Sequence, residues 1–238
     1  AYTPQHTYAV LGRPVVTRGA PVTAETRQSS AATVRPTSTV GYNAFGEKAD
    51  VRDANGHVTH IAYDRAGRTT STTLPAYTPH GATDPLPGEV TSAYDAAGNL
   101  VSETDALGRT TSYAYDQLGN LSKVTLPASE DAAAPVSTFT YDLLGEQLSA
   151  TGPTGARTEA TYDDLGRQVT STVIERHPAP GAFTTTYIYD DAGNLRSTKS
   201  PAGLTASGTY NAAGDPLTAT DTAGGVTVYA YGPTGLPT

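Results

Sequence analysis

The chain has 238 residues, of which 37% are hydrophobic and 16% are charged, a composition that fits one large or two ordinary folded domains and excludes a disordered or collagen-like polymer. Fifteen Lys and Arg against twenty-three Asp and Glu give a formal net charge of -8, which argues against nucleic acid, heparin or an anionic membrane as partners. The absence of Cys excludes a disulfide framework, a thiolate nucleophile and a Cys-based zinc site, and no apolar run reaches the length of a membrane span.

The chain begins with a weak copy of a motif that recurs along its length, a Tyr followed four residues later by a Gly. Tyr8 and Gly12 form this first copy, and a Thr-, Ser- and Pro-rich insertion follows it near residues 19–39. We therefore expect residues 8–41 to be a degenerate first repeat. The sequence contains no Met, and we interpret it as a segment of a longer polypeptide.

Nine regular copies of the motif follow over residues 42–238. Five of the nine intervals between successive motif tyrosines are 21 residues long and the other four are 21 residues plus an insertion, so the repeating unit has 21 residues. Such a period indicates one small structural unit stacked many times. The Tyr and Gly pairs are Tyr42 and Gly46, Tyr63 and Gly67, Tyr94 and Gly98, Tyr115 and Gly119, Tyr141 and Gly145, Tyr162 and Gly166, Tyr189 and Gly193, Tyr210 and Gly214, and Tyr231 and Gly235.

Each unit carries two turn signals, which predict a β-hairpin. After the motif Tyr, an Asp can accept backbone N–H bonds as an Asx-turn, and the Gly three residues later supplies the positive φ of a type I turn with a G1 bulge. A second, weaker turn lies fourteen residues after the Tyr, at Gly56, Gly108, Gly155, Gly203 and Gly224. The turn aspartates are Asp64, Asp95, Asp116, Asp142, Asp163 and Asp190.

The segments between the turns alternate in the manner of strands. Over residues 110–115, Thr111, Tyr113 and Tyr115 are expected on one face, with Thr110, Ser112 and Ala114 on the other. The positions two before the Tyr and just before the Gly are mostly apolar, so we expect both columns to stack from unit to unit beside tyrosines that pack in the interior of the sheet. The length also predicts a buried core.

The fold class expected from these signals is all-β. We predict one array over residues 1–238, a repeat-built antiparallel sheet of 21-residue hairpin units that twists into a partial shell or solenoid. The insertions replace the second turn, and they form expected loops near residues 75–90, 127–136 and 176–183.

The run from Tyr94 to Asp116 resembles the Rhs or YD-repeat family, which includes bacterial Rhs and wall-associated proteins, insecticidal toxin complexes and the animal teneurins. The resemblance extends over most of residues 42–235. It implies a spiralling β-sheet shell, secreted or displayed on a surface, that in many bacterial members encloses a C-terminal toxin. The aspartate-dependent self-cleavage signature of toxin-bearing members does not occur before Thr238, so we expect neither self-cleavage nor cargo to be encoded in this segment. Closing a shell in this family takes several times this many residues, so the resemblance implies only part of a wall unless copies associate.

No catalytic, cofactor or metal site is predicted. Six equivalent turn aspartates provide no singled-out carboxylate pair, and the nonapeptide of calcium-binding β-rolls is absent. His57 and His60 are spaced so that they would face opposite sides of a strand. The arginines that follow a turn Gly are expected to pair with turn carboxylates or to be solvated, and they are Arg13, Arg68, Arg109 and Arg167.

These observations predict a structural role rather than an enzymatic one. We expect a non-enzymatic β-sheet wall or scaffold of a secreted or cell-surface Rhs-like protein, forming part of a toxin-enclosing shell or a self-associating filament. Its expected partners are neighbouring repeats of the parent chain, further copies of itself, an enclosed toxin or a surface glycan. The alternative is an adhesion module that binds a glycan or a protein through the insertion loops.

Overall fold

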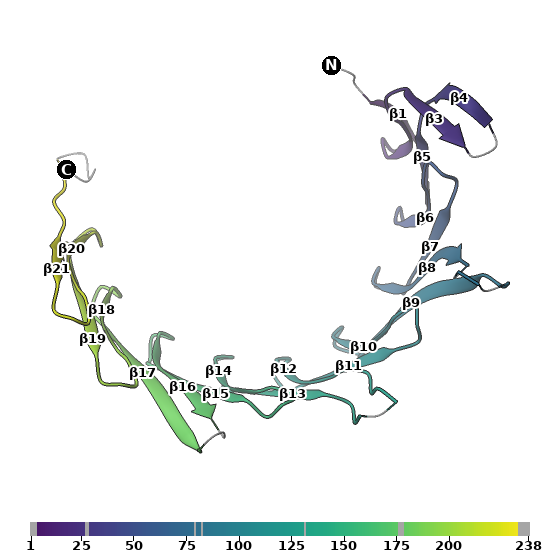
Figure 1. Cartoon of the computed structure of the whole chain (residues 1–238). Helices are drawn as coiled ribbons and strands as arrows, with labels where there is room; N and C mark the ends of the chain where they lie inside the picture. Colours follow the sequence, from purple (N-terminus) through teal and green to yellow (C-terminus); the bar gives the residue numbers. More distant parts are fainter. Residues whose placement is uncertain are drawn as a thin grey trace. The chain divides into compact units, whose positions relative to one another are not determined.

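The computed structural model describes residues 4–26, 29–78, 80–81, 83–130, 132–175 and 179–232. Within these ranges every helix or strand element is a β-strand, which confirms the predicted all-β class (Figure 1). Nineteen strands belong to one antiparallel sheet and two form a separate hairpin. The described residues include no helix of the length and apolarity that a bilayer crossing requires.

The chain divides into two compact units, residues 1–112 and 113–238, and the division falls inside strand β11 (Thr110–Tyr115). The first unit contains β1 (Gln5–Tyr8), β2 (Pro14–Arg18), β3 (Val22–Thr26), β4 (Ser29–Val34), β5 (Thr37–Tyr42), β6 (Lys48–Arg52), β7 (Val58–Tyr63), β8 (Thr69–Tyr77), β9 (Leu86–Tyr94) and β10 (Leu100–Thr104). The second unit contains β12 (Leu121–Thr125), β13 (Val136–Tyr141), β14 (Gln147–Thr151), β15 (Arg157–Tyr162), β16 (Gln168–Glu175), β17 (Gly181–Tyr189), β18 (Leu195–Lys199), β19 (Thr205–Tyr210), β20 (Pro216–Thr220) and β21 (Val226–Val228).

Within each unit, strands pair with their neighbours in chain order. In the first unit the exception is the hairpin of β3 and β4 (Figure 1). This hairpin lies in the sequence between β2 and β5, and those two strands pair directly with each other. This hairpin occupies the Thr-, Ser- and Pro-rich insertion, and the Gly19 N–H donates to the Pro36 carbonyl at 2.8 Å across its base. The insertion is therefore an additional hairpin on a continuous ladder.

The turns have the geometry that their sequences predict. At the turn that begins with Asp64, the Asp64 N–H donates to the Arg68 carbonyl at 2.9 Å and the Gly67 N–H donates to the Asp64 carbonyl at 3.1 Å. Gly67 has a φ of 78°. Next to this turn the strand register shifts by one residue between Ala62 and Tyr63. A bulge at this point increases the local twist of the ladder, and similar shifts accompany the tyrosines of other motif turns.

The two faces of the sheet differ in exposure. In β11 the predicted face of Thr111, Tyr113 and Tyr115 is partly buried, and the opposite face is exposed. The expected core is absent, however, because no apolar side chain among the described residues is fully buried, and Ser149, which is 7% exposed, is the buried polar residue. The prediction of a core was wrong because alternation identifies a half-covered face but does not supply a second layer to cover it.

Two of the three predicted insertion loops begin as longer strands. Residues 75–77 end β8 and residues 86–90 begin β9, and these strands pair as far as Tyr77 and Leu86. Residues 181–183 begin β17, which pairs with β16 as far as Glu175 and Gly181. Residues 127–136 contain an isolated bridge between Ser129 and Ala132. Residues 79, 82, 131 and 176–178 of these segments lie outside the described residues.

Candidate functional site

The stacked motif turns concentrate the charged and aromatic side chains of the chain along the sheet. In each typical turn the first residue is an Asp whose Oδ1 accepts two backbone N–H bonds. Asp64 Oδ1, for example, accepts from Ala66 at 2.8 Å and from Arg68 at 3.0 Å. These bonds satisfy turn donors that would otherwise face water, so the residue type follows from the turn geometry. The six predicted turn aspartates all lie in such turns.

The residue after each turn Gly completes the turn by pairing with the first residue through side chains. Arg68 and Arg167 donate to Asp64 and Asp163, and Asn99, Asn120 and Asn194 donate their amides to Asp95, Asp116 and Asp190 at 3.0 Å. Where the later residue is acidic, the first residue can be Asn and the roles reverse. Asn43 donates to Glu47 at 2.6 Å and Asn211 donates to Asp215 at 2.8 Å.

These bonds lower the pKa values of the turn aspartates. The Asn194 amide is the largest cause for Asp190, followed by the Asn194 backbone N–H. The Arg167 guanidinium is the largest cause for Asp163. Each carboxylate is thus held ionised by donors of its own turn, and this occupation leaves it poorly suited to proton transfer.

One motif turn breaks this donor and acceptor rule. Asp142 and Glu146 occupy the paired positions, and both are acids. The pKa of Glu146 is raised, first by desolvation and then by its hydrogen bond to Asp142 and the charges of Asp142 and Asp163. The pKa of Asp142 is lowered, chiefly by the Glu146 backbone N–H. When Glu146 is protonated, its carboxyl group can donate to Asp142 in the way that the arginine or amide side chain does in the other turns.

The motif tyrosines join successive repeats. Tyr189 donates its hydroxyl to the Gln168 carbonyl at 3.0 Å, and this carbonyl belongs to the residue two positions after the preceding turn Gly. Nine of the ten motif tyrosines are partly buried, whereas Tyr8 is 58% exposed. Other motif tyrosines form the same bond, among them Tyr42, Tyr63, Tyr94, Tyr162, Tyr210 and Tyr231.

Three of these rings are also covered by an arginine from the preceding turn. The Cζ atoms of Arg13, Arg68 and Arg167 lie 5.0, 4.6 and 4.8 Å from the ring centroids of Tyr42, Tyr94 and Tyr189. Arg68 and Arg167 pair with turn carboxylates as predicted, and so does Arg109 with Asp105 at a second turn. Arg13 has no such partner because its turn begins with Ala9, and its buried Nε has no hydrogen-bond partner among the described residues.

The predicted apolar column just before each Gly is not packed. Leu11, Phe45, Leu118, Leu144 and Leu165 are 76%, 90%, 59%, 78% and 75% exposed. The prediction was wrong because these residues occupy the tips of the turns, which project beyond the strands that could cover them. The result is a series of exposed apolar side chains beside turn carboxylates.

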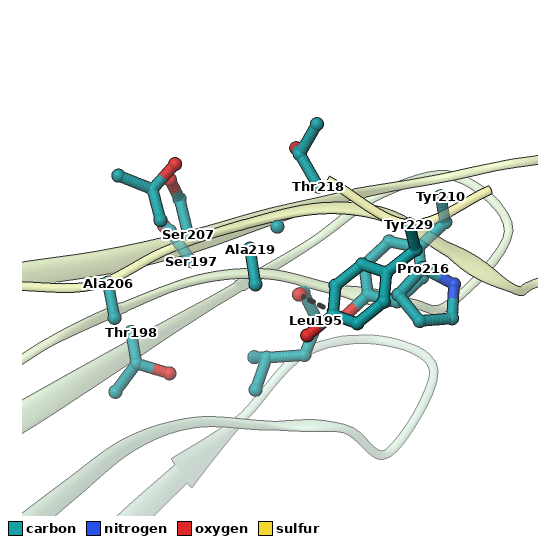
Figure 2. A pocket seen from close by; sticks show the side chains of 12 residues that line it. Leu195, Ser197, Thr198, Ala206, Ser207, Tyr210, Pro216, Thr218, Ala219 and Tyr229 are labelled. Carbon is teal, nitrogen blue, oxygen red and sulfur yellow. Dashed lines mark hydrogen bonds between the residues drawn. The ribbon is translucent and has the colours of Figure 1, made fainter. Parts of the chain in front are cut away.

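Hollows on the sheet are shallow and formed by few side chains. Figure 2 shows one of about 250 Å³ in the second unit, where Gly208 leaves space beside Tyr210 and Tyr229. Leu195, Ala206 and Ala219 line it as well, and the Tyr210 hydroxyl bonds the Leu195 carbonyl at 2.9 Å. The lining combines apolar, aromatic, serine and threonine residues and contains no carboxylate or histidine.

The structure brings together no catalytic or metal-binding constellation among the residues it describes. No group of three or more His, Asp or Glu side chains in that part of the chain could hold a metal ion. His57 pairs with Asp53 inside a second turn at 3.1 Å, and His60 pairs with Asp50 across β6 and β7. The last predicted repeat residue, Gly235, lies outside the described residues.

Residues 94–131, which include three of these turns, match the family model described as RHS Repeat. This segment therefore matches an RHS repeat. No curated protein matches the chain in sequence. Among solved structures, the chain is similar to the TcdB2-TccC3-TEV structure, with 17% identity, a TM-score of 0.61 and coverage of 99% of this chain and 15% of that one.

Two further solved structures share the fold of this chain. TcdB2-TccC3 without the hypervariable C-terminal region has 19% identity and a TM-score of 0.59 over 97% of this chain and 14% of that one. The Tc holotoxin pore of Photorhabdus luminescens, with a substituted TccC3, has 18% identity and a TM-score of 0.57 over 97% of this chain and 15% of that one. The chain thus spans about 15% of the length of the toxin-complex chains that it matches.

Sequence reasoning identified the Tyr, Asp and Gly positions but missed the residue after the Gly as a general pairing position. The signal was present, since Asn43 precedes Glu47 and Asn211 precedes Asp215 at the same four-residue spacing as Asp64 and Arg68. The carbonyl acceptors of the tyrosines carry no sequence signal, because any residue supplies a backbone carbonyl.

Proposed function

We propose that this chain is a non-enzymatic wall segment of a larger, secreted Rhs-like protein. The observation that carries the proposal is the single-layered sheet: the chain of 24.5 kDa exposes 16388 Å². A compact monomer of this mass would expose about 10,000 Å². A sheet with this much uncovered surface supports a role as part of an assembly in which other polypeptide covers one of its faces.

The repeat contacts supply the cohesion that a core would otherwise provide. Each unit contributes its strand ladder, most of them add a tyrosine bond to the preceding unit, and in several an arginine lies over that tyrosine. Stability in such an array is approximately a sum of terms between neighbours. The use of the turn aspartates in these turns supports a structural role over a catalytic one.

The covering partner belongs to the proposal as well. We infer that the partly buried face meets a further part of the parent protein, with an enclosed toxin as one form of it. Among the described strands, β1 pairs only with β2, and β21 pairs only with β20. These outer edges are suited to further repeats of the parent chain, or to copies that add into a filament.

An adhesion role remains the second candidate because two insertion hairpins carry exposed aromatic side chains. Tyr77 is 68% exposed at the end of β8, and Phe183 is 46% exposed on β17. Substitution of Tyr77→Ser together with Phe183→Ser, with retention of the sheet, separates the two functions. Loss of binding to cells or to a glycan array in this variant favours adhesion, and unchanged binding favours the wall.

The wall proposal is tested by deleting one complete unit, residues 142–162. This deletion joins Tyr141 to Asp163 and preserves the turn sequence, so we expect a folded chain with an unchanged β-type circular dichroism spectrum per residue. Deletion of residues 142–151 is the control, because it removes a single strand and turn and reverses every later strand. If the chain is a wall of stacked units, the first deletion leaves it folded and the second does not. Unfolding by the first deletion, or loss with it of a specific enzymatic activity, would overturn the proposal.

A further inference from the structure

A hollow between two successive motif turns of the second unit lies where an arginine side chain is found in some other repeats. It measures about 360 Å³ and is lined by Asp116, Gln117, Leu118, Tyr141, Asp142 and Leu143. Leu118 is 59% exposed and Leu143 is 90% exposed. The lining combines two carboxylates, one aromatic side chain and two apolar side chains that are open to solvent.

Equivalent positions in other repeats show which group fits such a lining. Arg167 extends from its turn over the ring of Tyr189, with Cζ 4.8 Å from the ring centroid, and its Nη2 lies 2.7 Å from Asp163 Oδ2. Its Nη1 also donates to the backbone carbonyl of Asp190, the first residue of the next turn, at 3.1 Å. Asp116, Tyr141 and Asp142 correspond to Asp163, Tyr189 and Asp190 in the repeat pattern.

Arg68 provides a second, independent instance in the first unit. Its Cζ lies 4.6 Å from the centroid of Tyr94, and its Nη2 lies 2.6 Å from Asp64 Oδ2. The chain therefore places a guanidinium between a turn carboxylate and the next motif tyrosine at more than one repeat.

The hollow lacks this guanidinium because the corresponding residue is Asn120. The Asn120 amide donates to Asp116 Oδ2 at 3.0 Å and ends there. Unlike Tyr94 and Tyr189, Tyr141 forms no hydroxyl bond to the preceding repeat within the part of the chain that the structure describes. Asp142 faces another acid, Glu146, where the other five motif-turn aspartates face an arginine or an asparagine. This turn therefore has two acids and no cationic or amide side chain at the paired position.

We propose that this hollow binds an arginine side chain presented by a second polypeptide. The guanidinium lies over Tyr141 between the carboxylates of Asp116 and Asp142, and the methylene stem contacts Leu118 and Leu143. Charge complementarity selects a cation, and the ring selects a planar one, because guanidinium stacks on an aromatic face and forms paired hydrogen bonds where an ammonium acts as a compact point charge. This inference does not depend on the proposed wall function.

The test is a titration of the full chain, labelled at leucine methyl groups, followed by NMR. The probe is the peptide acetyl-Gly-Arg-Gly-amide, compared with the same peptide carrying lysine or the uncharged isostere citrulline. We expect selective shifts of the Leu118 and Leu143 methyl signals, with a dissociation constant on the order of 1 mM for a single side chain. Binding of the lysine and citrulline peptides should be at least about tenfold weaker.

Two matched variants locate the site. Asn120→Arg supplies the guanidinium from within the chain and should abolish the response to the arginine peptide. Asn194→Arg introduces the same change at the equivalent position of another repeat and should leave the response intact. Asp142→Asn, which keeps the size of the side chain, should weaken binding about tenfold while the spectrum remains that of a folded protein.

Three results would overturn the proposal. They are equal shifts with all three peptides, an undiminished response in Asn120→Arg, or no shift of either leucine at 20-fold excess over the expected constant.

Discussion

The guanidinium of Arg167 lies over the ring of Tyr189 while its Nε and Nη2 both bond Asp163 Oδ2 at 2.7 Å. One side chain thereby contacts the carboxylate of its own turn, the aromatic ring of the next repeat and the carbonyl that begins the next turn. Because the sheet has no buried apolar core among its described residues, such links between repeats have more importance here than in a layered protein.

Replacement of Arg167 by Ala should destabilise the chain more than the same change at Arg109. Both arginines pair with an Asp four residues before them, but Arg167 alone of the two has a recorded contact with a tyrosine ring. We expect the free energy of unfolding to fall by about 1 kcal/mol more for Arg167→Ala than for Arg109→Ala in urea denaturation. Arg167→Lys should lie between wild type and Arg167→Ala. Equal losses at the two positions would show that the ring contact contributes nothing.

A motif tyrosine hydroxyl should contribute to stability only where it donates a hydrogen bond to the preceding repeat. Tyr189→Phe removes the donor to the Gln168 carbonyl and should lower the free energy of unfolding by about 1 kcal/mol. Tyr8→Phe is the matched control, since Tyr8 is 58% exposed and precedes the first complete repeat. It should leave the urea midpoint unchanged. A comparable decrease for both variants would contradict the assignment of the hydroxyl bond as a link between repeats.

The repeat and its turns could be predicted because their causes are local. A Tyr, an Asp and a Gly at fixed spacing specify the Asx-turn, the positive φ and the hairpin without information from distant residues. The strand faces of residues 110–115 followed from alternation for the same reason. The absent core could not be predicted, because Phe45 and Leu165 are apolar in sequence and only the geometry of the turn shows that they project into solvent.

The contacts between repeats could be predicted only in part. Arg68 and Arg167 could be assigned to turn carboxylates from their spacing, but their positions over Tyr94 and Tyr189 depend on how one hairpin is placed on the next. The hollow at Asn120 could not be predicted either, because this also requires the placement of one hairpin on the next. Only the structure shows that arginines in other repeats occupy the space that the short Asn120 side chain leaves open.

Substitution of a motif glycine should be costly only where the turn requires a positive φ. Gly193 has a φ of 90°, and Gly193→Ala should lower the free energy of unfolding by about 1–2 kcal/mol. Gly152 has no positive φ, and a Cβ there would meet the Ala156 carbonyl oxygen at an ordinary 3.8 Å. Gly152→Ala should therefore be neutral or slightly stabilising. The midpoints of thermal unfolding compare the two variants, and a greater loss at Gly152 would contradict the turn assignment.

The acid pair of Asp142 and Glu146 should make the chain gain stability on mild acidification. The folded state raises the pKa of Glu146 above the ordinary Glu value of 4.5. Protonation of Glu146 therefore stabilises the folded state fully below pH 4.5, and this stabilisation is lost as the pH rises through the raised pKa. The aspartates with lowered pKa values act in the opposite direction, but their contribution is lost only as the pH falls below 3.8 toward their folded values. Between pH 4.5 and 7, Glu146 therefore determines the slope at this turn.

Glu146→Gln isolates this effect. The amide donates to Asp142 at every pH, as Asn120 does to Asp116, so the variant should melt at a higher temperature than wild type at pH 7. The difference should shrink as the pH approaches 4.5, because wild type then carries its own proton. Glu47→Gln is the control, since Glu47 already accepts a bond from Asn43 at 2.6 Å, and it should show no such gain. A melting difference between Glu146→Gln and wild type that stays constant from pH 7 to 4.5 would mean that the two acids do not share a proton.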